Sequence, residues 1–226
     1  MNKFINILLI AMLIPTMFIT IYVGLDLPIG FLHVSGHNLP YRDEILLGFG
    51  VLMFVVILRK SIRRWMGVSI VSKVKKFVWN AEISQARKSR VRMYLIMESV
   101  VMLTMAIGLY MITEVALPPA LALALGTLDN IIFGLVPNKY RVGISSKALI
   151  IADREVILIY FSGLRKVSSH QQSIYFDYIK GLQLAFPTNC VDDSDKAKFF
   201  EVLEEQVDTD RVFFSKTMNK VETPTS

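Results

Sequence analysis

Residues 45–58 read ILLGFGVLMFVVIL, and they decide how many times the chain crosses a membrane. The run carries no charge and lies between Glu44 and Arg59. As a helix it spans only about 21 Å, less than the ~30 Å hydrocarbon core, so its length alone also fits a re-entrant segment. Tyr41 before the run, and Arg59 with Lys60 after it, are suited to the two membrane interfaces. We therefore expect a full crossing.

Three other apolar runs accompany it, at residues 4–25, 93–113 and 120–136. The first could be a secretory signal peptide, but it is longer than the usual ~7–15 apolar residues and no A-x-A-like site follows. An uncleaved span is therefore the better interpretation. The whole chain of 226 residues is 53% hydrophobic and only 19% charged, with a mean hydropathy of +0.48. This composition excludes an ordinary soluble protein, which carries about 25% charged residues.

Loop charges predict the orientation of the spans. Residues 59–92 contain eleven basic residues and one acid, a net charge of +10, whereas residues 26–44 have a net charge of −2. An excess of Lys and Arg marks the cytoplasmic side of a membrane. Four crossings place residues 26–44 outside, in the loop of the first transmembrane pair (1–58), and residues 59–92 inside. We expect a multi-pass membrane protein with both termini cytoplasmic.

The third and fourth spans should form a transmembrane hairpin over residues 93–136. Pro118 and Pro119 suit a helix start after a short turn. Ala120 and Ala124, like Ala122 and Gly126, are four residues apart, a spacing that lets helices approach closely in lipid. Alanine as a simple apolar filler is the alternative.

Two acidic residues fall inside the two apolar spans of this hairpin. Glu98 lies near the cytoplasmic end of the third span and Asp129 near that of the fourth, so the two should sit at similar, shallow depth. Ionisable groups inside membranes are costly and are often functional. We expect structural pairing with Arg92 or Arg141, with a proton or ion pathway and contact with a partner helix as alternatives.

The basic segment 59–92 contains WMGVSIVSKVKKFVW at residues 65–79. Its apolar residues recur every three to four positions, which predicts an interfacial helix over 65–79. The residues expected at the membrane surface, facing lipid or anionic headgroups, are Trp65, Lys73, Lys75, Lys76 and Trp79. A topology determinant is favoured over recognition of a specific headgroup. Nucleic acid is not expected as a partner, because both ends of the segment join membrane spans.

After Pro137 the composition becomes neutral, with twelve basic and twelve acidic residues over 137–226. Short runs rich in Val, Ile, Tyr and Phe alternate with turns and predict strands. The pair Lys180-Gly181 separates SIYFDYI from LQLAFP and indicates a hairpin. A helix over 196–207 begins after acids, with Phe199, Val202 and Leu203 on its apolar face. Residues 208–226 should form a flexible tail.

This region resembles the C-terminal domain of the bacterial YcxB-like membrane protein family. The resemblance covers about residues 138–207 and rests on FSGLRKV (161–167), SIYFDYIKGLQLAFP (173–187) and DSDKAKFFEVLEE (193–205). It implies a multi-pass protein of a bacterial inner (cytoplasmic) membrane, with a transmembrane hairpin followed by a cytoplasmic domain of pleckstrin-homology-like character over 137–207. The chain departs from the family pattern by an extra pair of spans and the basic segment. The strands after Pro137 are too few for a complete barrel, so either upstream residues supply the rest or the sheet is partial.

No residues in the sequence form a recognisable catalytic or cofactor site. His33 and His37 lie four apart beside acidic residues, but Pro28 and Gly36 make a helix unlikely there, so a solvated loop is favoured over a metal site. His170 has no evident nucleophile or acid partner, and Cys190 should pack as a small apolar group. We expect no enzyme activity, no cofactor and no bound metal.

The expected fold class is therefore four transmembrane helices with a small α+β cytoplasmic domain, an antiparallel sheet and a C-terminal helix. We expect this domain to bind a protein partner or to regulate a membrane process, and a homo-oligomer is compatible with the sequence. The expected partner-binding residues are aromatic: Tyr160, Phe161, Tyr175, Phe176 and Tyr178. The alternatives are a small transporter or channel-like protein that uses Glu98 and Asp129, and, less favoured, a membrane enzyme acting on lipid.

Overall fold

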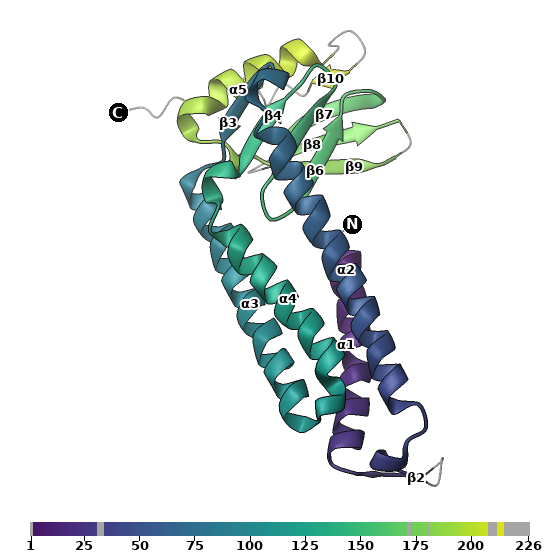
Figure 1. The fold of residues 1–226 in the computed structure, drawn as a ribbon. Coiled ribbons are helices and arrows are strands. Elements are labelled where there is room, and N and C mark those ends of the chain that lie inside the picture. Colours follow the sequence, from purple (N-terminus) through teal and green to yellow (C-terminus); the bar gives the residue numbers. More distant parts are fainter. Residues whose placement is uncertain (1, 31–33, 171–172, 180, 208–211, 215–226) are drawn as a thin grey trace. The chain divides into compact units, whose positions relative to one another are not determined.

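The computed structural model of the chain describes residues 2–30, 34–170, 173–179, 181–207 and 212–214 (Figure 1). The chain divides into two compact units, each made of two separate stretches of sequence. The helical unit comprises Met1–Arg63 and Met93–Leu135. The β-rich unit comprises Arg64–Arg92 and Val136–Ser226.

Among the described residues, four helices are long and apolar enough to cross a membrane. They are α1 (Asn2–Gly24), α2 (Arg42–Val71), α3 (Gln85–Ile112) and α4 (Leu117–Gly134). The short elements between them are β1 (Pro28–Ile29), β2 (Val34–Ser35), η1 (Gly36–Asn38) and η3 (Glu114–Ala116). The expectation of four long apolar helices is confirmed, and α2 continues well beyond the run 45–58 that predicted it.

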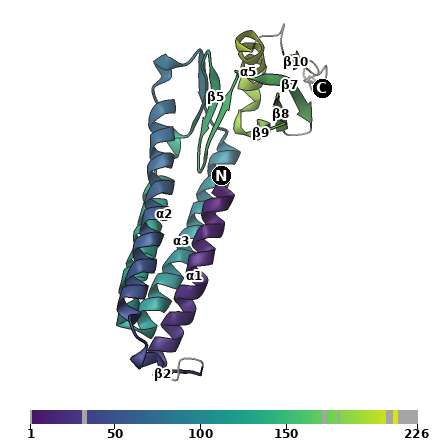
Figure 2. The same ribbon diagram turned by 90° about the vertical axis from the view of Figure 1, so that its right-hand side faces the viewer.

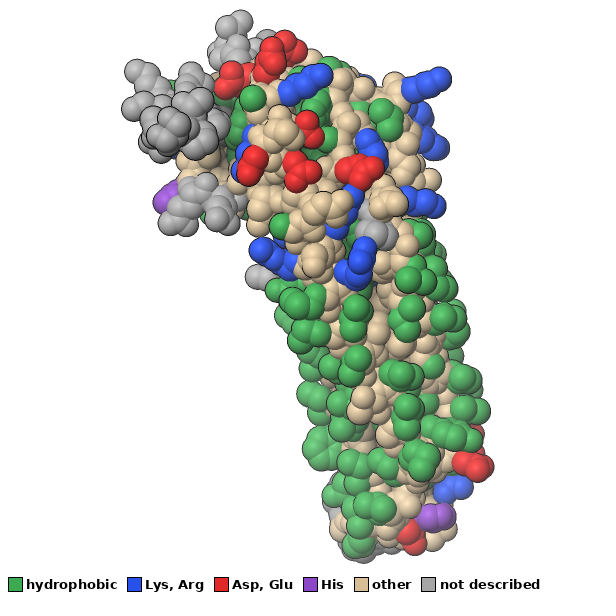
Figure 3. All heavy atoms as spheres, turned by 90° about the vertical axis from the view of Figure 1, so that its left-hand side faces the viewer, with side chains coloured by type: hydrophobic (Ala, Val, Ile, Leu, Met, Phe, Trp, Pro, Cys, Tyr) green, Lys and Arg blue, Asp and Glu red, His purple; other side chains and the backbone are tan. Residues whose placement is uncertain are grey.

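Small residues bring the helices of this unit together. Ala106 and Leu109 of α3 pack with Ala120 and Leu123 of α4 in a buried cluster. A Cβ atom on Gly50 of α2 would lie only 2.7 Å from the carbonyl carbon of Pro118, so the backbones of α2 and α4 meet there. Large apolar side chains cover the outside of the helices, as Figure 3 shows on one face. Such exposure is typical of a surface made for lipid.

Within the described residues, the β-rich unit holds two four-stranded sheets. The first has the order β3-β4-β5-β6 with antiparallel neighbours, and the second has the order β10-β7-β8-β9. The first contains β3 (Trp79–Glu82), β4 (Arg141–Ile144), β5 (Ala148–Ala152) and β6 (Val156–Tyr160). The second contains β7 (Leu164–His170), β8 (Ser173–Tyr178), β9 (Gln183–Pro187) and β10 (Phe213–Phe214). The remaining elements are η2 (Val74–Lys76), η4 (Pro137–Lys139), η5 (Thr188–Cys190) and α5 (Asp193–Gln206).

Strand β3 comes from the segment between α2 and α3, upstream of the expected domain. Trp79 of β3 pairs with Ile144 of β4 in antiparallel register. The boundary predicted at residue 137 is therefore too late, because residues 64–92 belong to the same compact unit. The upstream origin of a missing strand, one of the two alternatives drawn from the sequence, is what the structure contains.

The single interfacial helix predicted over 65–79 is wrong. Helix α2 ends at Val71, η2 covers Val74–Lys76, and β3 begins at Trp79. The apolar side chains of this segment do not share one exposed face, since Val68, Val71 and Trp79 are buried within the chain, whereas Val74 and Val78 are exposed. Gly67 lies so close to Val156 of β6 that a Cβ atom would meet its Cγ2 at 2.1 Å. Part of the apolar period that predicted a lipid-facing stripe, Val68 and Val71, therefore packs in a core.

Helix α5 joins the two sheets through Phe199. The Phe199 ring stacks on Phe186 of β9 at a centroid distance of 5.0 Å and meets Trp79 of β3 edge-on at 5.3 Å. Figure 2 shows α5 beside the strands of the β-rich unit. Phe199, Val202 and Leu203 are buried, which confirms the predicted apolar face. The β8–β9 hairpin is confirmed as well, with Gly181 at a φ of +74° in its turn.

The tail predicted over 208–226 is only partly described, and its described part is not a loose chain. Phe213 and Phe214 form β10, which pairs in parallel with Lys166 and Val167 of β7. Val212, just before β10, is buried. Residues 208–211 and 215–226 lie outside the described residues.

Candidate functional sites

A polar cluster lies among the four long helices. Lys60 of α2 donates a hydrogen bond to Oε1 of Glu98 on α3, and both side chains are largely buried. Beside this pair is a cavity of about 10 Å³, close to the smallest space that holds one water molecule. The residues that line the cavity come from all four helices: Leu9, Ile57, Lys60, Glu98, Met102, Gly126, Asp129 and Asn130.

The structure brings Glu98 and Asp129 to the same cavity, as their similar depth in the two spans predicts. Lys60, which was not singled out from the sequence for this role, is an ion-pair partner of Glu98. Arg141 belongs to the β-rich unit, where its Nε donates to Asn80 Oδ1. The sequence places Lys60 at the edge of an apolar run, which suggested an interfacial lysine and hid its role in the cluster.

The small residues of α4 shape the wall of this cavity. A Cβ atom on Gly126 would lie 2.4 Å from Met102 Cε of α3. Asn130, one turn further along α4, lies with its Nδ2 3.8 Å from Met102 Sδ. Ala120 and Ala122 are buried too, which fits the close packing predicted from the spacing of small residues. The cavity therefore remains small, and a lysine, two carboxyl groups and an amide line it among the four long helices.

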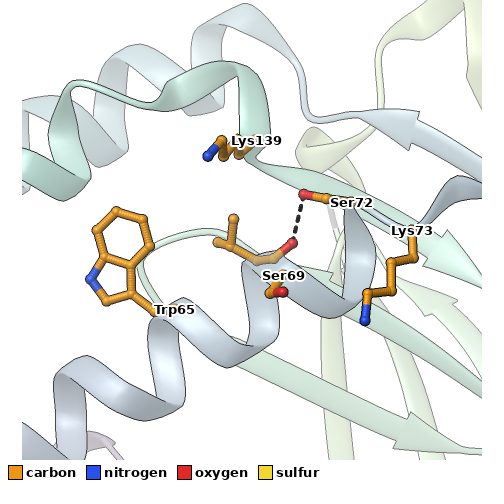
Figure 4. A pocket seen from close by; sticks show the side chains of 6 residues that line it. Trp65, Ser69, Ser72, Lys73 and Lys139 are labelled. Atoms are coloured by element: carbon orange, nitrogen blue, oxygen red, sulfur yellow. Dashed lines mark hydrogen bonds between the residues drawn. The ribbon is translucent and has the colours of Figure 1, made fainter.

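A second candidate site is a groove in the β-rich unit (Figure 4). Its volume is about 540 Å³, which lies in the usual range for small-molecule pockets. The groove residues are Trp65, Val68, Ser69, Ser72, Lys73 and Lys139. Trp65 and Lys73 were expected at the membrane surface, whereas Ser69, Ser72 and Lys139 were not singled out. Lys139 could not be linked to them by sequence, because α3 and α4 separate it from the others.

The other expected surface residues lie in different settings. Lys75 and Lys76 of η2 are exposed, but they do not line the groove. Trp79 is buried in the core beside Phe199 and cannot contact lipid from there. The membrane-surface set predicted from one helix is therefore divided between a groove, an exposed turn and a core.

Most of the expected partner-binding aromatic residues remain accessible, but one does not. Phe176 is fully buried, because alternate residues of β8 point into the core, so its assignment to a partner surface is wrong. Tyr160 is 55% exposed, and Phe161, Tyr175 and Tyr178 are partly exposed. The Tyr178 hydroxyl donates to the Tyr160 carbonyl oxygen at 2.7 Å.

An ion-pair network links the start of α3 to the first sheet. Lys88 Nζ donates to Glu82 Oε2 at 2.5 Å, and Arg141 Nη1 lies 3.6 Å from Glu82 Oε1. The hydrogen bond from Lys88 holds the pKa of Glu82 below its ordinary value. Lys88 is itself almost fully buried. The network ties β3 to α3 and β4, so we assign it a structural role.

The histidines and the cysteine do not assemble a reactive site among the described residues. His33 lies outside the described residues, and His37 Nδ1 is 3.2 Å from Asp26 Oδ1. The described part of the chain has no group of three or more His, Cys, Asp or Glu residues placed to hold a metal. Burial raises the pKa of the Cys190 thiol to about 12, so the thiol stays protonated at neutral pH. His170 is exposed at the end of β7.

In comparisons with known proteins, no protein-family model, no curated protein and no solved structure matches the chain. Function must therefore be inferred from the arrangement of the residues themselves.

Proposed function

We propose that the chain is a multi-pass protein of a bacterial inner membrane that displays its β-rich unit in the cytoplasm as an interaction or regulatory module, without catalysis. Four helices of sufficient length and apolarity support membrane insertion. Residues 59–92, which comprise the end of α2, its connection to α3 and the start of α3, carry a net charge of +10, and this excess supports a cytoplasmic position for the β-rich unit. The N-terminus then lies on the same side, since four crossings separate it from that unit.

The architecture of the β-rich unit supports the proposed kinship with the YcxB-like family and its pleckstrin-homology-like character. A four-stranded antiparallel sheet is followed by the β7-β8-β9 meander and then by α5, whose Phe199 packs against both sheets. The upstream strand β3 supplies the strand that residues after 137 lack. This fold class is a frequent scaffold for binding, and fold alone does not specify the ligand.

The observation that carries the proposal is an exposed apolar surface formed by the end of β6 and the β8–β9 turn, which we call the turn patch. Its residues are Tyr160, Ile179 and Leu182, which are 55%, 72% and 55% exposed. Hydrogen bonds hold these segments together, from Ile179 N to the Gly163 carbonyl oxygen and from the Tyr178 hydroxyl to Tyr160. Ordered apolar side chains on a soluble unit are typical of a protein-binding surface.

Site-specific photocrosslinking in native membranes tests this function. A photoreactive amino acid at Tyr160 or Leu182 should give the same crosslinked product, and one at the exposed Lys198 of α5 should not. Adding Ile179→Glu should abolish the product without lowering the amount of the protein. If position 198 gives the same product, or if Ile179→Glu leaves it unchanged, the turn patch is not the partner surface.

Cysteine labelling tests the proposed topology. The chain has one cysteine, the buried Cys190, so Cys190→Ala provides a background for new cysteines. A cysteine at Asn38, in η1, should react with an impermeant reagent in intact cells. A cysteine at Ser194, in α5, should react only after the membrane is opened. Reaction of both from the same side would contradict the three crossings, α2, α3 and α4, that the proposed topology places between them.

A small transporter or channel-like protein is the second candidate, and the polar cluster favours it. The specific observation is that Lys60, Glu98 and Asp129 line one cavity among the four long helices. In liposomes, Asp129→Asn should change proton or cation flux at constant protein content if the cluster transports ions. If Asp129→Asn lowers only the amount or stability of the protein, the carboxyl groups are structural.

A further inference from the structure

Among the residues that the structure describes, the groove in the β-rich unit is lined by positive charge only. Its residues are Trp65, Val68, Ser69, Ser72, Lys73 and Lys139. Lys73 and Lys139 are its charged members, and no acid is among the described residues that line it. The two lysines come from chain segments separated by α3 and α4, and the fold of the β-rich unit gathers them around one hollow. Two like charges on one concave surface favour an anionic occupant.

The uncharged residues of the groove add the hydroxyl groups of Ser69 and Ser72 and an apolar wall. Ser72 Oγ donates to the Val68 carbonyl oxygen at 2.7 Å, so its proton is already used within α2 and the following turn. Ser69 is exposed on the last turns of α2 and brings a further hydroxyl to the groove. Trp65 and Val68 supply the apolar part, and Figure 4 shows the serines between Trp65 and Lys73. The groove thus combines cations with an apolar face.

We propose that this groove binds the phosphate-bearing headgroup of an anionic phospholipid, with the lysines at the phosphate and Trp65 beside the glycerol and upper acyl chains. A lipid fits better than a soluble phosphate for two reasons. The groove has an aromatic wall, and tryptophan is enriched at the headgroup level of membranes. Trp65 also follows the uncharged run 45–58 by seven residues in the same helix. This choice of lipid rests on the membrane position proposed above.

Native mass spectrometry of the detergent-solubilised full chain measures this binding. The probes are dioleoyl-phosphatidylglycerol and, as the zwitterionic control, dioleoyl-phosphatidylcholine. The wild type should retain one phosphatidylglycerol with clear preference over phosphatidylcholine. The Lys73→Gln/Lys139→Gln variant should bind it about thirtyfold more weakly, because each lysine near an anionic headgroup contributes roughly fivefold. Lys73→Arg/Lys139→Arg keeps both charges and should bind within a few-fold of the wild type.

The matched control is Lys75→Gln/Lys147→Gln, which removes the same charge from two exposed lysines outside the groove and should bind as the wild type does. Equal weakening in the control and groove variants would overturn the proposal in favour of general surface charge. Equal retention of the two lipids would overturn it as well, as would displacement of the lipid by excess inorganic phosphate. Crosslinking at the turn patch should be unchanged in the groove variant. Loss of lipid binding and loss of the crosslinked product therefore test the lipid site and the proposed protein partner separately.

Discussion

The indole of Trp79 meets the phenyl ring of Phe199 edge-on, with the ring centroids 5.3 Å apart. Trp79 lies in β3, before α3 and α4, and Phe199 lies in α5, near the end of the described chain. Their contact joins the two segments that build the β-rich unit. Aromatic pairs in this geometry contribute about 0.5–1.5 kcal/mol beyond the area that they bury.

We expect Trp79→Ala to destabilise the β-rich unit by about 3–5 kcal/mol, because it removes a large buried side chain from the centre of that core. Thermal unfolding of the full chain, followed by near-ultraviolet circular dichroism, checks this. Trp65→Ala is the matched control, since Trp65 is only partly buried beside the groove. Equal losses in the two variants would contradict the assignment of Trp79 to the core.

Glu98→Gln should lower the stability of the helical unit by about 3 kcal/mol, because it removes the carboxylate that accepts a hydrogen bond from the largely buried Lys60. The double change Lys60→Met/Glu98→Leu removes both charges and should recover most of the loss. The midpoint of unfolding in a titration with dodecyl sulfate measures both. A double variant less stable than Glu98→Gln would contradict this account, because it would show that the ion pair stabilises the helical unit more than apolar side chains do at the same positions.

Gly50→Ala and Gly48→Ala form a matched pair on α2. A Cβ atom at position 50 would meet the backbone of Pro118 at 2.7 Å, whereas one at position 48 has no neighbour within 4 Å. The first substitution should force α2 away from α4 and cost about 1–3 kcal/mol. The second should be neutral or stabilising by up to about 1 kcal/mol, as alanine favours helix. The same unfolding titration distinguishes them, and equal effects would contradict the close approach at Gly50.

The pair of Glu82 and Lys88 should make stability depend on pH. The pKa of Glu82 is lowered below its ordinary value of 4.5, chiefly by the hydrogen bond from Lys88, so the unfolded chain binds the proton more readily. The contribution of Glu82 is therefore present above pH 4.5 and is lost as the pH falls below it. The unfolding temperatures of the wild type and Glu82→Gln should differ at pH 7 and converge in acid. A constant difference across this range would contradict the assignment.

The long helices were predictable because their apolar runs are nearly free of charge, and a hydrophobic run needs no tertiary information to be recognised. The β8–β9 hairpin was predictable too, since Lys180-Gly181 separates two strand-like runs. Strand β3 was not. Its four residues WNAE lie inside a basic segment whose valines follow a helical period, and its pairing with β4 depends on residues about sixty positions away.

The residues of the candidate sites were likewise only partly predictable from the sequence. Glu98 and Asp129 could be identified singly, because an acid in an apolar run is conspicuous. Lys60 and Lys139 could not, because each lies beside an apolar segment, where a lysine is ordinary, and only the packed chain brings it to its neighbours. Sequence patterns thus located single unusual residues, whereas the sets they belong to are products of the fold.

The origin of β3 has a consequence for how the chain is made. The ribosome completes Trp79–Glu82 before it has made α3 and α4, yet the partner of β3, Arg141–Ile144, follows both helices. During synthesis β3 therefore has no strand partner until α3 and α4 have been made. The β-rich unit can be completed only after these two helices have been synthesised. A chain that stops before β4 would present an open strand edge to aggregation and quality control.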